Sequence, residues 1–66
     1  METTDQAIER HRDNIRVAEG VIRSADRMIR ARRDTGIDAS NLERFRARAE
    51  SNLKSNREAL RKLGTE

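Results

Sequence analysis

Apolar residues recur at regular helical spacing along both halves of this 66-residue chain. In the first half the apolar row consists of four isoleucines, seven residues apart, with two alanines between them: Ile8, Ile15, Ala18, Ile22, Ala25 and Ile29. A seven-residue apolar repeat is typical of the buried seam of a coiled coil. In the second half the row consists of Leu42, Phe45, Ala49, Leu53, Leu60 and Leu63. The pattern predicts two long helices and no strand.

Capping signals indicate where the first helix begins and ends. Thr3 and Gln6 fit a capping box, in which the threonine hydroxyl accepts from a first-turn amide and the glutamine reaches back to the cap. The following thirty residues contain no proline, and Gly36 then supplies the left-handed residue on which helices commonly stop. We therefore expect helix 1 at about residues 4–35.

Capping residues also indicate where the second helix begins. Asp38 is a favourable N-cap, and Ser40 with Glu43 forms a competing capping box two residues later. Gly64 supplies the stop. We expect a turn at residues 36–38 and helix 2 at about residues 39–63.

A turn of this length makes the two helices antiparallel neighbours. Residues should then face each other when their numbers sum to about 75, which places Ile29 near Phe45 and Ile22 near Leu53. The predicted fold class is all-α: residues 1–66 form a single domain, a two-helix antiparallel hairpin of coiled-coil type.

Helix 1 carries more apolar surface than one neighbour can cover. Val17, Val21 and Met28 form a second row, with Gly20 and Ser24 small beside it. Both rows together span roughly 160°, whereas packing against one helix takes about 100°. We interpret these five residues as a partner interface. Its occupant would be a second hairpin, giving a homodimeric four-helix bundle, or a larger protein; simple exposure is the remaining alternative.

Three polar residues fall near the predicted seam. Asn52 and Asn56 lie inside the apolar arc of helix 2, where a buried amide commonly fixes register and partner number. We interpret both as register residues rather than as a ligand site. His11 lies on the seam side of helix 1 and is interpreted as a packing histidine.

Arginine dominates the basic residues of the chain. There are fifteen basic and twelve acidic residues, and the pI is about 10.5. The excess lies near the turn, and we identify there a candidate patch for an anionic partner: Arg27, Arg30, Arg32, Arg33, Arg44, Arg46 and Arg48. Along helix 1, Glu19 and Asp26 are expected to match Arg23 and Arg30 at i, i+4.

Nucleic-acid binding through this patch is therefore the alternative function. Two such hairpins packed together resemble the ROP-type RNA-binding bundle in helix number, helix length and loop, and the resemblance implies RNA as a partner. Against base readout, Phe45 is the only aromatic residue and is expected in the core, which leaves no stacking platform.

Composition excludes several other classes. There is no cysteine and only one histidine, so disulfides and the common zinc sites are excluded, and no metal or cofactor is expected. A two-helix hairpin offers no cleft for catalysis, so the chain is not predicted to be an enzyme. No apolar segment suits a membrane span or a signal peptide, so the expected location is cytoplasmic. No small-molecule substrate is expected either. The sequence favours a small interaction protein, a regulator, inhibitor or assembly factor of bacterial or phage type.

Overall fold

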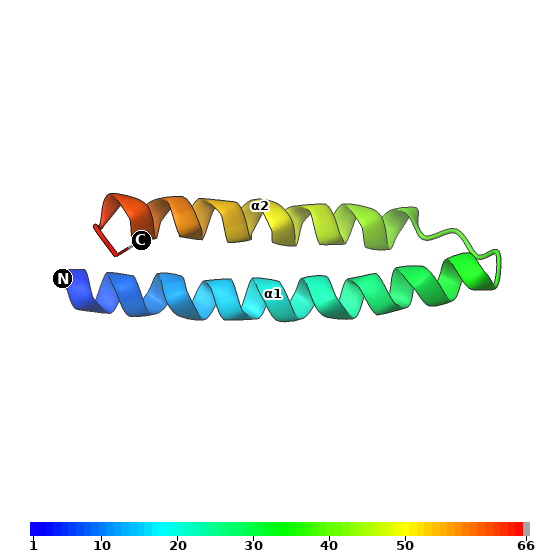
Figure 1. Cartoon of the computed structure of the whole chain (residues 1–66), viewed down its shortest axis with the longest axis horizontal. Helices are drawn as coiled ribbons and strands as arrows, with labels where there is room; N and C mark the ends of the chain where they lie inside the picture. The colour runs from blue at the N-terminus through cyan, green and yellow to red at the C-terminus, as the bar shows by residue number, and fades with distance from the viewer. Residues whose placement is uncertain (66) are drawn as a thin grey trace.

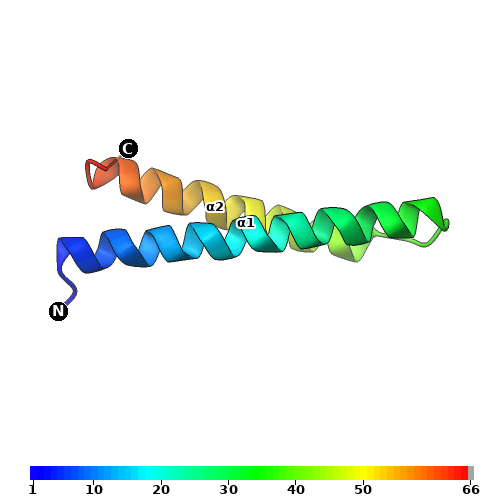
Figure 2. The same cartoon turned by 60° about the horizontal axis from the view of Figure 1, so that its bottom comes forward.

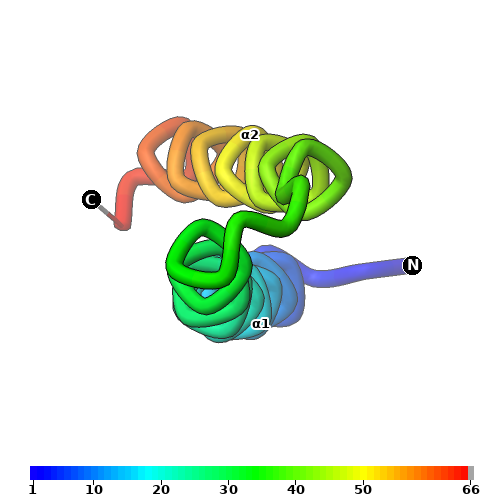
Figure 3. The backbone as a smooth tube through the Cα atoms, turned by 90° about the vertical axis from the view of Figure 1, so that its right-hand side faces the viewer, coloured from blue at the N-terminus to red at the C-terminus, as the bar shows by residue number. Residues whose placement is uncertain are grey.

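The computed structural model describes residues 1–65 and contains two α-helices, α1 (Thr4–Asp34) and α2 (Ser40–Lys62). The helices lie side by side and antiparallel, so the start of α1 and the end of α2 lie opposite the turn (Figure 1). A second view shows that they cross at an angle (Figure 2), and the view along the hairpin shows α2 lying over α1, with the turn joining them (Figure 3). The extents are 48 × 21 × 14 Å. The prediction of an all-helical two-helix hairpin is confirmed.

The capping box at the start of α1 is also confirmed. The backbone amide of Gln6 donates to Thr3 Oγ1 at 3.1 Å, and the backbone amide of Thr3 donates to Gln6 Oε1 at 2.9 Å. Two backbone donors that a helix end leaves without partners are thereby satisfied.

Both helices end on a glycine in the left-handed conformation. Gly36 has φ +73° and Gly64 has φ +83°. After α1, the Ile37 amide donates to the Arg32 carbonyl at 2.8 Å and the Gly36 amide donates to the Arg33 carbonyl at 3.1 Å. This pair of bonds is the Schellman motif, which needs a residue with positive φ.

The start of α2 differs from the prediction by one residue. The helix begins at Ser40, and Ala39 in the cap position makes no side-chain hydrogen bond. Asp38 nevertheless supports the first turn, because its Oδ1 accepts from the Ser40 amide at 3.0 Å. Hydrogen bonds from the Ser40 hydroxyl and amide lower the pKa of the Asp38 carboxyl. The connection is longer than predicted because Ala39 is buried against α1 before the helix starts.

Most of the buried side chains between the helices are small. The buried residues in the described part of the chain are Ala18, Ala25, Ile29, Ala39, Ala49 and Leu60. Alanine at facing positions allows the two helix axes to approach closely, since interaxial distance depends on the side chains at the contact.

The predicted register between the helices is wrong by about one turn. Ile29 packs with Ala25, Ala39 and Leu42, and the side chain of Phe45 is 53% exposed. The seam of α2 alternates steps of three and four residues through 39, 42, 46, 49, 53, 56 and 60, all buried or half-buried. A strict alternation of this kind leaves Phe45 on the flank of the seam.

Candidate interaction face

Ion pairs join the two helices along one broad side of the hairpin. Among residues 1–65, the ion pairs that join the two helices are Arg33–Glu43 at 2.7 Å, Arg46–Asp26 at 2.6 Å and Arg57–Glu19 at 3.6 Å. The three α1 members stand seven residues apart, so they share one flank of that helix. The Asp26 carboxylate also raises the pKa of the Arg46 guanidinium through its hydrogen bond.

These pairs replace the ones expected from sequence. Glu19 and Asp26 bind arginines of α2 instead of Arg23 and Arg30, their neighbours at i, i+4. The carboxylates lie beside the seam, where an arginine from the other helix can reach them. Arg23 and Arg30 lie further round α1 and are exposed.

The other broad side carries apolar and amide side chains. From α1, Val17 is 66% exposed, Met28 is 49% exposed and Val21 is half-buried. From α2 come Phe45 and, seven residues later, the exposed side chain of Asn52. We call these five residues the uncovered face. Phe45, the core residue expected from sequence, therefore belongs to this surface.

Both helices contribute to this face at a common depression. The depression is lined by Asn14, Val17 and Ala18 of α1 and by Asn52 and Asn56 of α2. Phe45 lies two turns before Asn52 on the same flank of α2, and Met28 lies on the same flank of α1 as Asn14 and Val21, because residues seven apart repeat their direction. The apolar side chains of the two helices are thus on one side.

The small residues of the predicted interface lie at the edge of the uncovered face. Ser24 is exposed and Gly20 is half-buried. A Cβ atom added at Gly20 would meet only Arg23 Nη2, at 3.9 Å. Packing within the hairpin therefore does not require glycine at this position.

A polar cluster joins the helices toward the end that carries the termini. His11 Nδ1 lies 2.7 Å from Asn56 Oδ1, and Asn14 Nδ2 donates to the same oxygen at 3.2 Å. Asn56 Nδ2 donates to the backbone carbonyl of Asn52 at 2.7 Å. His11 and Asn56 are half-buried, whereas the Asn52 side chain is exposed. The prediction that Asn52 lies inside the seam arc is wrong, because the seam passes through Leu53 and Asn56.

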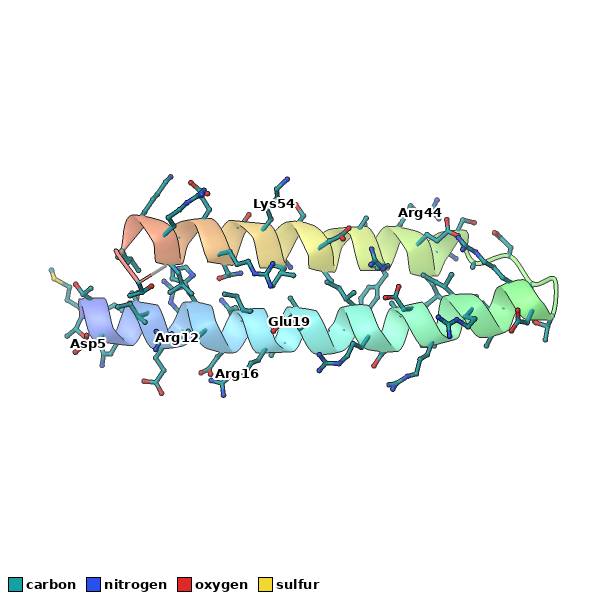
Figure 4. The ribbon with its side chains drawn as sticks, in the orientation of Figure 1. Asp5, Arg12, Arg16, Glu19, Arg44 and Lys54 are labelled. Carbon is teal, nitrogen blue, oxygen red and sulfur yellow. The ribbon has the colours of Figure 1, made fainter. Side chains whose placement is uncertain are left out.

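The seven arginines of the predicted anionic-partner patch do not converge on one surface. Arg33 and Arg46 are engaged in interhelical ion pairs, Arg32 donates to the Asp38 carbonyl at 3.4 Å, and Arg44 donates to Asn41. In the described part of the chain, the remaining three are exposed and make no ion pair or side-chain hydrogen bond: Arg27, Arg30 and Arg48. Charged side chains occupy the outer surfaces of both helices: Arg44 and Lys54 point away from α1, and Arg16 points away from α2 (Figure 4).

Two further kinds of site can be checked among the described residues. Within residues 1–65, no three His, Cys, Asp or Glu side chains come together as a metal site. Neither helix combines the length and the apolar character that crossing a membrane requires. Comparisons of the chain with protein-family models, curated proteins and solved structures gave no match. The fold therefore defines the class as an all-α helical hairpin, and the uncovered face is its candidate site.

Proposed function

We propose that this chain is a small non-enzymatic protein that acts by protein–protein interaction through its uncovered face. The observation that carries the proposal is the difference between the two broad sides of the hairpin. Three ion pairs span one side, while the other exposes Val17, Met28 and Phe45. Grouped exposed apolar residues of this kind mark interaction sites more often than scattered ones do.

Covering this face would be energetically favourable. Full burial of one valine, methionine or phenylalanine side chain is worth about 1.5–3 kcal/mol. Val17, Met28 and Phe45 are each about half exposed or more, so a partner could gain several kilocalories per mole from these three side chains.

The geometry suits a partner that supplies two further helices. Two helices laid over a two-helix face complete a four-helix bundle, in which apolar residues from all four helices share one core. These helices would come from a second copy of the chain or from a larger protein. The chain would then act as a regulator, inhibitor or assembly factor.

Site-specific photo-crosslinking in the native cells tests this proposal. A photoreactive phenylalanine analogue at Met28 should give a defined covalent adduct, because that side chain would lie in the contact. The same analogue at Lys54, which points away from α1, is the matched control and should give none (Figure 4). Equal labelling from both positions, or no adduct from Met28, would reject the interaction face.

A further inference from the structure

We infer that the occupant of the uncovered face is a second copy of this chain, and that Phe45 of α2 is an anchor of the resulting two-fold contact. The inference rests on the proposed function and names the partner for the same face. The two copies together would form a four-helix bundle.

The exposed area supports a partner of this size. The chain exposes 5168 Å², whereas a compact monomer of 7.6 kDa exposes roughly 4,300 Å². The excess of roughly 900 Å² is close to the area of about 800 Å² that each partner buries in a standard protein–protein interface. One such contact would bring the exposed area of each chain to an ordinary value.

The core of the single hairpin is also small. In the described residues, four of the six buried side chains are alanine, and only Ile29 and Leu60 are large. Domains below about 70–80 residues commonly need disulfides, a metal or oligomerisation to be stable. This chain contains no cysteine and therefore no disulfide, and association is a stabilising route open to it.

The chemistry of the face suits contact with itself. In a two-fold contact the same surface of each chain meets its identical copy. The side chains on that surface must therefore pack against identical side chains without repulsion between like charges. The residues of the uncovered face are apolar apart from the amide of Asn52, which can both donate and accept a hydrogen bond. None of them carries a charge, although the chain has a net charge of +3. Docking to an acidic protein would instead favour basic residues on the face.

Phe45 is the largest apolar side chain on this face. Aromatic residues are enriched in the buried centres of interfaces and often contribute most of the binding energy. Its neighbour Arg46 is fixed by ion pairs to Asp26 and Glu50, which hold this part of α2 in place. Phe45 itself lies outside the hairpin seam, and about half of its side chain is exposed in the single hairpin.

Sedimentation equilibrium of the purified chain and its variants tests the inference. The wild type should have the mass of two chains, and Phe45→Ala should raise the dimer dissociation constant about tenfold or more, as loss of an interface anchor does. Ile37→Ala is the matched control, because it removes an apolar side chain of similar exposure from the turn, outside the face. It should leave the dissociation constant within about twofold of the wild type.

Val21→Glu is a second variant, and it should give a single-chain mass because a carboxylate would enter the contact. A wild type with the mass of one chain at about 1 mM would overturn the second copy as occupant. An adduct from Met28 in cells would then still support the proposed function with a different protein. Equal dissociation constants for Phe45→Ala and Ile37→Ala would overturn the role of Phe45.

Discussion

At the scale of single residues, Asn56 makes the most specific contact between the helices. Its side-chain oxygen accepts from Asn14 and lies 2.7 Å from His11 Nδ1, while its amide donates to the Asn52 carbonyl. A half-buried amide keeps this position only where such partners are aligned, because a lost partner leaves a polar group unsatisfied. The contact would therefore favour one register of α2 against α1.

Replacing Asn56 by alanine should measurably destabilise the hairpin. We expect Asn56→Ala to lower the free energy of unfolding by about 1 kcal/mol, the usual net contribution of a hydrogen bond. His11→Ala should lower the free energy of unfolding by less in the Asn56→Ala background than in the wild type, because the hydrogen bond between the two side chains is already absent there. Urea denaturation measures both effects, with the exposed Ser51→Ala as a control expected within about 0.5 kcal/mol of the wild type. Strictly additive losses would contradict the shared hydrogen bond.

Sequence periodicity assigned some residues correctly and misplaced others. The seam positions Ala18, Ala25 and Ile29 are buried as their seven-residue spacing predicts. Phe45 was misplaced because hydrophobicity favours a large aromatic residue in the core, whereas the seam of α2 passes through Leu42, Arg46 and Ala49. The same shift places Asn52 outside the seam. Both errors follow from the register, which depends on side-chain volume and the path of the turn.

At the scale of elements, the glycine after α1 determines how that helix ends. Gly36 adopts φ +73° so that the amides of Gly36 and Ile37 can bond carbonyls of the last turn. The glycine could be recognised from sequence, because few other residues adopt this conformation. The burial of Ala39 could not be recognised, since it arises from contact with Ala25 and Ile29 across the turn.

Substitution of Gly36 tests whether the positive φ at this position is what favours glycine. Gly36→Ala should lower the free energy of unfolding by about 1–2 kcal/mol, because a Cβ atom is strained at positive φ. Gly36→Asn should lose clearly less, since asparagine tolerates the left-handed region. Thermal unfolding measures the difference, which for a domain of this size is about 4–8 °C per kcal/mol. Equal losses for alanine and asparagine would contradict backbone strain as the cause.

The partners of the interhelical ion pairs could not be recognised from sequence. Residues i and i+4 on one helix are neighbours, so Glu19 and Asp26 were expected to bind Arg23 and Arg30. Whether a carboxylate beside the seam turns to its own helix or to the other depends on which arginine lies opposite. That choice follows from the packing of α2, which brings Arg46 and Arg57 to these carboxylates.

At the scale of the whole molecule, the hairpin has two unlike sides. One is spanned by ion pairs, and the other exposes the apolar residues that the seam does not use. The surplus apolar row of α1 could be recognised from sequence, because it exceeds what one neighbour covers. The continuation of this apolar surface onto α2 through Phe45 could not be recognised from sequence, because the position of Phe45 depends on the register between the helices.

Nuclear Overhauser effects between isotope-labelled and unlabelled copies test whether a second copy covers the uncovered face, since they report contacts between different chains. In an equimolar mixture, we expect effects between chains for the methyl groups of Val21 and Met28. We expect none for Ile29, which is buried within its own hairpin. Absence of these effects at Val21 and Met28, or their appearance only on the ion-paired side, would contradict a second copy as the occupant of the uncovered face.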